Sequence, residues 1–149
     1  MSNYHPLYHK IWEDHKFLDY SPHQQLIFIY LVSNANCRIS GIYEISPRTI
    51  SCSTNIELER VKELLLTFDE ETLSYDFNSG TVFVKNFFKY NLGKMGNARV
   101  IQHSLINNLR IIPHTQFWND FNERYKEELG KLKTKVEGFK NKKKKEAVG

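Results

Sequence analysis

Between residues 21 and 87 the sequence predicts a helix, a short strand, two helices and a tight two-stranded hairpin, and this order restricts the fold more than any other feature. Two of the helices begin with the same pair, Ser21-Pro22 and Ser46-Pro47, in which serine can cap the helix and proline suits its first position. Gln24 completes a capping box at the first start. Residues 26–32 (LIFIYLV) follow almost without a polar residue, which predicts a central, buried helix.

The middle of this region contains a strand and a third helix. Residues 41–45 (GIYEI) alternate in polarity and form a short strand. The second helix runs through Ser51, and the chain turns around Ser53. Thr54 and Glu57 then make another capping box and open a third helix that extends to about Phe68. The core face of this helix consists of apolar residues at helical spacing: Val61, Leu65 and Phe68, flanked by Leu58 and Leu64.

A hairpin closes the region. Leu73, Tyr75 and Phe77 share one face of a strand, residues 78–80 (NSG) are turn residues, and residues 81–85 (TVFVK) return. Together these elements predict an α+β, mainly α fold, namely a winged helix-turn-helix. This architecture is used mostly for docking on nucleic acid or on partner proteins.

The rest of the chain divides around this core. Residues 1–20 are expected to form an N-terminal arm or short helix, residues 21–91 the winged-helix core, and residues 92–125 a helical extension with helices at about 97–109 and from near 116. Residues 126–149 are expected to be a basic tail, partly helical or disordered. An apolar seam of about two heptads, too short for a coiled coil, is expected either to pack on its own domain or to be weakly helical: Leu129, Leu132, Val136 and Phe139.

Charge is unevenly distributed along the chain. Residues 1–125 carry 12 Lys and Arg against 13 Asp and Glu, a net charge of −1, whereas residues 126–149 carry nine Lys against four Glu, a net charge of +5. The whole basic excess therefore lies in the last 24 residues. A Lys-rich end of this kind is either an arm for phosphate groups or a solvated, solubilising tail.

The sequence contains no recognisable catalytic or cofactor motif. It lacks a phosphate-binding loop, a dinucleotide fingerprint and a nucleophile elbow. Cys37 and Cys52 lack metal-ligand spacing, and His5 and His9 have no third ligand. We expect no enzyme activity, cofactor or metal. With no signal peptide and no apolar run of about 20 residues, we also expect a cytoplasmic protein that does not enter membranes.

Three groups of residues resemble a known family. They are residues 11–14 with the Ser21-Pro22 helix, residues 41–50, and Tyr75-Asp76 leading to residues 82–91 (VFVKNFFKYN). Over roughly residues 9–125 the chain resembles the N-terminal winged-helix domain of phage and prophage replication proteins from low-GC Gram-positive bacteria, which are related to DnaD-like primosome proteins.

The resemblance implies a role in replication initiation through origin or primosome association. It also implies self-association, as a homodimer or higher oligomer, and contact with replisome or helicase-loading proteins. Such proteins often continue into a second, C-terminal domain, whereas this chain has a basic tail. Helicase loading is therefore expected to be missing or supplied by another protein.

The outward face of the third helix leaves two interpretations open. With Val61 at the centre of the core face, a helical projection places Ile56, Glu59, Glu63 and Leu66 outward. Two outward carboxylates are unfavourable for reading DNA and suit a protein contact better. Trp12 and Phe17 of the arm are further candidates for a protein interface.

Basic and polar residues elsewhere provide the candidate contacts to DNA, which we expect to be duplex. The neighbouring aromatic residues Phe87, Phe88 and Tyr90 could stack on bases, but we expect them to pack in the core. The candidates for DNA contacts are Arg48, Thr49, Asn55, Arg60, Lys62, Asn78, Ser79, Lys85, Lys89, Lys94, Arg99, Lys142, Lys143, Lys144 and Lys145.

Three functions are consistent with these observations: a DNA-binding replication-initiation protein, a protein–protein adaptor of a replisome, and a winged-helix transcriptional regulator.

Overall fold

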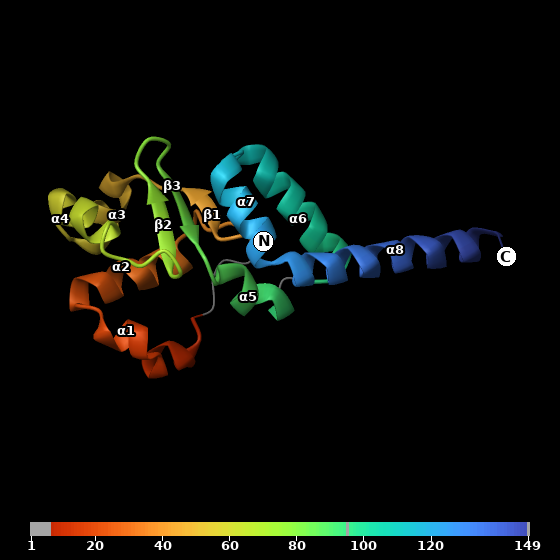
Figure 1. The fold of residues 1–149 in the computed structure, drawn as a ribbon, viewed down its shortest axis with the longest axis horizontal. Coiled ribbons are helices and arrows are strands. Elements are labelled where there is room, and N and C mark those ends of the chain that lie inside the picture. The colour runs from red at the N-terminus through yellow and green to blue at the C-terminus, as the bar shows by residue number, and fades with distance from the viewer. Residues whose placement is uncertain (1–6, 95, 149) are drawn as a thin grey trace.

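A computed structural model describes residues 7–94 and 96–148, and for residue 94 and residues 139–148 it describes the backbone alone. The chain is mainly helical with one small antiparallel sheet, which confirms the predicted α+β class (Figure 1). The helices are η1 (His9–Glu13), α1 (His15–Asp19), α2 (Pro22–Ser33), α3 (Pro47–Thr54), α4 (Leu58–Leu65), α5 (Phe87–Asn91), η2 (Leu92–Lys94), α6 (Ala98–Ile111), α7 (Thr115–Arg124) and α8 (Lys126–Val148). The strands are β1 (Ile42–Glu44), β2 (Leu73–Asp76) and β3 (Thr81–Val84).

The sheet has the order β1-β3-β2, so the last strand in the sequence is the central one. Val82 of β3 lies opposite Tyr43 on one side and Tyr75 on the other. Every residue of β3 is buried, because helices cover both faces of the sheet. Figure 1 shows α2, α3 and α4 on one side of the sheet and α6 and α7 on the other.

The two Ser-Pro helix starts form as predicted. Ser21 and Gln24 make the capping box at α2, with the Ser21 backbone N–H donating to Gln24 Oε1 at 2.8 Å. Ser46 Oγ accepts from the backbone N–H of Thr49 at 3.1 Å and caps α3. Both caps satisfy N–H groups that have no partner inside the helix.

The predicted start of the third helix at Thr54 is wrong. Thr54 is the last residue of α3, and its Oγ1 donates back to the Ile50 carbonyl oxygen at 2.7 Å. The turn falls at Asn55, which has φ 60° and caps the end of α3, so α4 begins only at Leu58. Glu57 precedes α4 without making a side-chain cap.

The expectation that α2 is buried on all sides is also wrong. Ile27 and Leu31 are fully buried, whereas Leu26 is 42% exposed and the other apolar residues of the helix are half-buried. Figure 1 shows the helix between α1 and the α3–α4 pair, and this cover leaves several of its side chains partly open to water.

Aromatic packing joins the C-terminal helices to the sheet. Phe121 of α7 is 1% exposed and contacts the rings of Phe83, Phe88, Trp118 and Tyr125. Phe87 and Phe88 lie in α5, a short helix that the sequence did not predict, and both are buried as expected. The expectation of core packing is wrong for Tyr90 of the same helix, which is 56% exposed. Residues 92–125 therefore share one hydrophobic core with the sheet.

The apolar seam of α8 packs on its own domain, as predicted. Leu132 and Val136 are buried, Leu129 is partly buried, and α8 lies against α6. The side chain of Phe139 lies outside the described part of the chain. Beyond Val136, α8 projects from the body as a single helix (Figure 1).

A buried amide fixes α6 to β1. Asn108 Oδ1 accepts from Ser40 Oγ at 2.6 Å and from the Ser40 backbone N–H at 3.2 Å, and its Nδ2 donates to the Ile42 carbonyl at 3.1 Å. Asn108 is 2% exposed, so these bonds satisfy its polar atoms away from water.

Among the helices formed by the described residues, none combines the length and apolar content that a membrane span requires.

Candidate nucleic-acid interface

The chain that enters α3 lies beside the β2–β3 hairpin. The Ile45 backbone N–H donates to the Gly80 carbonyl at 2.9 Å, and Tyr75 Oη donates to the Ile45 carbonyl at 2.6 Å. These bonds hold the chain entering α3 beside the hairpin turn. Four predicted DNA contacts are therefore exposed near one another: Arg48, Thr49, Asn78 and Ser79.

The hairpin tip is held by Asp76. Its carboxylate accepts from Ser79 Oγ at 2.7 Å and from the Asn78 backbone N–H at 3.0 Å, and its Oδ2 lies 2.9 Å from His114 Nε2. These hydrogen bonds, that from Ser79 foremost, keep the pKa of Asp76 below its ordinary value. Since His114 also caps α7, the tip is tied to the helical extension. The sequence did not indicate this contact, because the two residues are 38 positions apart.

Ile56 does not face outward, and this prediction is wrong. It is 4% exposed, because it belongs to the turn before α4 and points into the core instead of continuing the helical projection. Ser51 Oγ donates to its carbonyl oxygen at 2.6 Å and helps hold the turn. Asn55, beside it, is exposed as expected.

The basic residues of α4 are paired with acidic neighbours on the same helix. Arg60 Nη1 lies 3.2 Å from Glu63 Oε2, and Lys62 Nζ lies 3.3 Å from Glu59 Oε1. Glu59 and Glu63 are exposed, as predicted, and Leu66 at the end of the helix is 73% exposed. The outward face of α4 is therefore a mixture of acidic, paired and apolar groups, which is a poor complement to phosphate.

Lys85 is not available to DNA, and its prediction as a contact is wrong. Lys85 as a whole is 4% exposed, and its ammonium group forms an ion pair with Asp120 of α7. The ammonium also lies 4.6 Å from the centre of the Phe83 ring, and the Lys85 carbonyl oxygen accepts from Tyr125 Oη. The lysine serves to join β3 to the base of α8.

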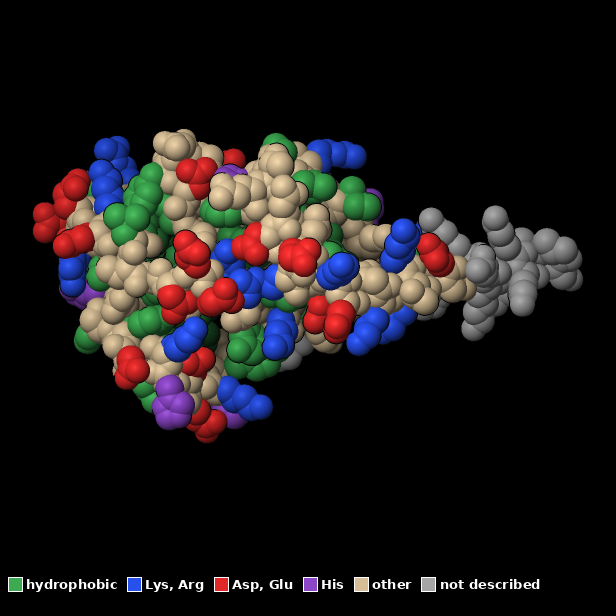
Figure 2. Space-filling view, in the orientation of Figure 1, with side chains coloured by type: hydrophobic (Ala, Val, Ile, Leu, Met, Phe, Trp, Pro, Cys, Tyr) green, Lys and Arg blue, Asp and Glu red, His purple; other side chains and the backbone are tan. Residues whose placement is uncertain are grey.

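The remaining basic candidates lie on other elements. Lys89 of α5 and Arg99 of α6 are exposed. Figure 2 shows basic side chains along the described part of α8, where Lys126, Lys131, Lys133 and Lys135 are exposed. Four further candidates lie in the last turns of α8 and one in η2, with side chains outside the described part: Lys142, Lys143, Lys144, Lys145 and Lys94.

The two aromatic interface candidates of the arm differ in exposure. Trp12 is 55% exposed and is available to a partner. Phe17 is 2% exposed, so the prediction that it forms an interface is wrong. It packs against Trp12, Tyr20 and Phe28 and fixes the arm to its own body.

The two cysteines differ in exposure, and the described residues contain no cluster of metal-ligand side chains around either of them. Cys37 is half-buried and donates to the Leu31 carbonyl at 3.3 Å, and burial raises the pKa of its thiol to about 11. Cys52 is exposed on α3. Among the side chains that the structure describes, no three from His, Cys, Asp or Glu are arranged to hold a metal ion.

Comparison with protein-family models, with curated proteins and with solved structures finds no match to this chain. The assignment of a function therefore depends on the geometry above.

Proposed function

We propose that this chain is a winged-helix protein that associates with nucleic acid. The order α2-β1-α3-α4-β2-β3 supports this class, with α3 and α4 as the helix pair and the β2–β3 hairpin as the wing. The sheet order β1-β3-β2, in which the first strand pairs with the second arm of the hairpin, supports it further. Its resemblance to phage and prophage replication proteins indicates the particular role: replication initiation on DNA in the cytoplasm.

The observation that carries this proposal is the concentration of positive charge on α8. Residues 126–148 hold nine Lys against four Glu on one helix that extends beyond the body. Lysines that neutralise DNA phosphates release condensed counterions, which supplies affinity without sequence readout. Because the outward face of α4 is acidic, we assign most of the affinity for DNA to α8 and a smaller share to Arg48 at the start of α3.

The test is fluorescence anisotropy on a labelled DNA duplex across a salt series. Replacing Lys142, Lys143, Lys144 and Lys145 together by glutamine should reduce the slope of log K against log salt by about one to four units, because each lost phosphate contact contributes about 0.9. Replacing the same four by arginine keeps the charge and should keep the slope. The full chain is used, because removing α8 would also remove the buried residues Leu132 and Val136.

Arg48→Ala in the same assay separates the two parts of the proposal. A further loss of about one unit of slope is expected if the α3 end also meets phosphate. If neither the glutamine variant nor Arg48→Ala changes binding, or the wild-type chain does not bind duplex DNA, the proposed function is wrong.

The exposed face of α4 favours a second function, that of a protein adaptor. Leu66 is 73% exposed beside Glu59 and Glu63, and an apolar residue with a charged rim suits a protein interface. On this interpretation the partner includes a second copy of the chain. The test is the oligomeric state, measured by sedimentation velocity.

Leu66→Lys should shift a self-associating chain toward the monomer without lowering its melting temperature, because the side chain is exposed. Ile106→Lys is the matched control: Ile106 is 54% exposed on α6, on the other side of the sheet. Equal sedimentation of Leu66→Lys and the wild type would exclude α4 as a self-association surface.

A further inference from the structure

The 17 acidic residues of the chain leave one long segment without a carboxylate side chain. All of them lie outside residues 77–119, and this segment contains five basic residues: Lys85, Lys89, Lys94, Arg99 and Arg110. Residues 1–76 carry 6 Lys and Arg against 11 Asp and Glu, a net charge of −5, which offsets the +5 of residues 77–119 in the total. The near-neutral body therefore contains a positively charged part, residues 77–119, which we call the acid-free segment.

The acid-free segment exposes two of its charges on α6. Lys85 is buried in its ion pair, and the side chain of Lys94 lies outside the described part of the chain. Lys89 is exposed on the short helix α5. α6 is 14 residues long, and its sequence (ARVIQHSLINNLRI) includes Arg99 and Arg110 but no Asp or Glu.

The exposed polar side chains of α6 form a stripe along the helix. Four residues make up this α6 stripe, and all are exposed: Arg99, His103, Asn107 and Arg110. They are spaced by four, four and three positions, so at about 100° per residue they fall within an arc of about 80°. The buried residues of the helix lie on the opposite side: Ala98, Ile101, Leu105 and Asn108. The α6 stripe therefore points away from the core.

Within the described part of the chain, the side chains of the α6 stripe have no partner. No described carboxylate lies within ion-pair distance of Arg99, His103 or Arg110. The side chain of Asn107 makes no hydrogen bond to a described residue, whereas the neighbouring Asn108 is buried and hydrogen-bonded. The guanidinium and amide N–H groups of the stripe are therefore free to donate to an external acceptor.

The composition of this face of α6 fits duplex DNA better than a protein. The stripe divides the exposed apolar residues, with Ile106 and Leu109 on one side and Val100 and Ile111 on the other. The core of a protein interface is apolar and depleted of charge, whereas charged side chains occupy the middle of this face. Arginine pairs with phosphate or guanine, and asparagine pairs with adenine. The α6 stripe therefore has the side chains that bind a duplex.

α6 is also adjacent to the proposed phosphate contacts of α8. The two helices pack against each other, and Figure 1 shows α8 extending past the beginning of α6. The outward face of α4, by contrast, carries Glu59 and Glu63, which repel phosphate. A duplex bound by α8 can therefore reach α6.

We propose that α6 binds duplex DNA in the major groove. This groove is about 12 Å wide and admits one α-helix, whose diameter with side chains is about 10–12 Å. Arg99 and Arg110, at the two ends of the stripe, contact phosphate oxygens, and His103 and Asn107, between them, contact base edges. The inference rests on the proposed function and adds to it: α8 supplies affinity for any sequence, and α6 distinguishes between sequences.

Fluorescence anisotropy on a labelled random-sequence duplex, across a salt series, tests the arginine contacts. The double variant Arg99→Gln with Arg110→Gln should reduce the slope of log K against log salt by about two units, because each lost phosphate contact contributes about 0.9. Both side chains are exposed, so the melting temperature should equal that of the wild type.

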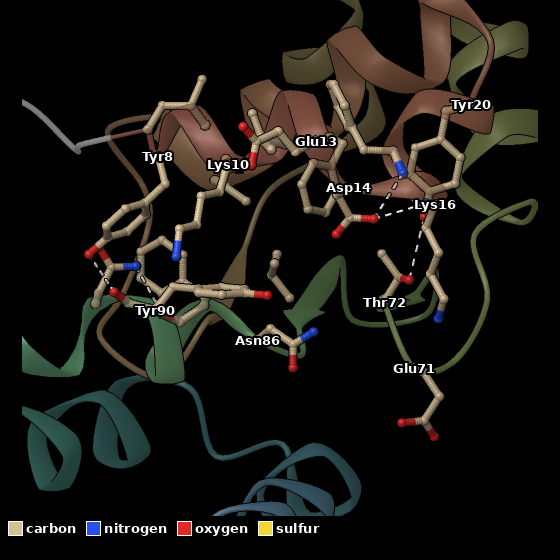
Figure 3. A pocket seen from close by; sticks show the side chains of 18 of the residues that line it. Tyr8, Lys10, Glu13, Asp14, Lys16, Tyr20, Glu71, Thr72, Asn86 and Tyr90 are labelled. Atoms are coloured by element: carbon tan, nitrogen blue, oxygen red, sulfur yellow. Dashed lines mark hydrogen bonds between the residues drawn. The ribbon is translucent and has the colours of Figure 1, made fainter.

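Lys10→Gln with Lys16→Gln is the matched control, since it also removes two exposed charges, here from the N-terminal arm. Figure 3 shows both lysines beside the cavity between residues 7–20 and the body, which we call the arm cavity. Figure 1 shows the arm beside α2, with α6 across the sheet. This control should keep the slope of the wild type.

Selection from a pool of random-sequence duplexes tests the base contacts. The wild type should enrich a preferred sequence. Asn107→Ala should lower the affinity for the enriched duplex about tenfold and leave the affinity for the random pool unchanged, because base contacts carry the sequence information and phosphate contacts do not. Asn122→Ala, at an exposed position of α7, is the matched control and should keep both affinities.

The assignment of α6 and the proposed function fail in different ways. If the wild-type chain binds no duplex, both are wrong. If it binds but the α6 arginine variant behaves like the arm control, or if Asn107→Ala keeps the sequence preference, the assignment of α6 is wrong and the proposed function stands. Binding of poly-glutamate that is lost in the arginine variant, with unchanged duplex binding, would identify an acidic protein as the partner of this face and would likewise overturn the assignment.

Discussion

Asp120→Ala is expected to lower the free energy of unfolding by about 3 kcal/mol, because it leaves the ammonium group of Lys85 buried without its counterion. The side chain of Lys85 is 5% exposed and that of Asp120 is 39% exposed, so the lysine is the partner that water cannot reach. Urea unfolding, followed by circular dichroism, measures the effect.

The double variant Asp120→Ala with Lys85→Met is the control. Methionine fills a similar volume without a charge, so much of the lost stability should return. If Asp120→Ala is as stable as the wild type, or if the double variant is no more stable than the single one, the ion pair does not have the importance assigned to it.

Gly41→Ala is expected to cost about 3 kcal/mol or more, or to prevent folding. Gly41 has φ +83°, which L side chains rarely adopt, and a Cβ there would lie 2.4 Å from the Val84 carbonyl oxygen and 2.9 Å from Phe87 Cβ. The backbone strain and the clash each cost roughly 1–3 kcal/mol. The Val84 backbone N–H also donates to the Gly41 carbonyl at 2.9 Å, so relief of the clash would disturb the β1–β3 pairing.

Gly80→Ala separates the strain from the clash. Gly80 also has a positive φ, +67°, but a Cβ there would meet only Tyr75 Oη at 3.8 Å. Its substitution should therefore cost only about 1 kcal/mol, the usual penalty for a left-handed conformation. Equal losses for the two alanine variants, measured by thermal unfolding, would contradict the close contact at Gly41.

The features that were correctly predicted from sequence are those fixed by short-range interactions. The caps at Ser21 and Ser46 involve residues three positions apart, and the hairpin turn at residues 78–80 depends on its own turn chemistry. The seam of Leu132 and Val136 was visible because helical spacing alone places both residues on one face.

The errors concern positions decided by distant contacts. Thr54 and Glu57 have the spacing of a capping box, but burial of Ile56 favours a left-handed Asn55 and a later helix start. From the sequence, Lys85 looks like an exposed residue at the end of a strand. Its burial depends on Asp120, which is 35 positions away in the sequence and lies beside it in the fold. The arm cavity likewise depends on how residues 7–20 lie across the body, which no local pattern specifies.

The attachment of α8 to β3 limits how many of its lysines can contact one DNA duplex at the same time. The Tyr125 bond to Lys85 and the burial of Leu132 and Val136 fix the direction of the helix, so its lysines keep set angular positions. At about 100° per residue, Lys131 and Lys135 lie on nearly the same side, and Lys133 points roughly the opposite way. A straight duplex can touch only one side of a rigid rod. The effective valence of α8 should therefore be smaller than its number of lysines.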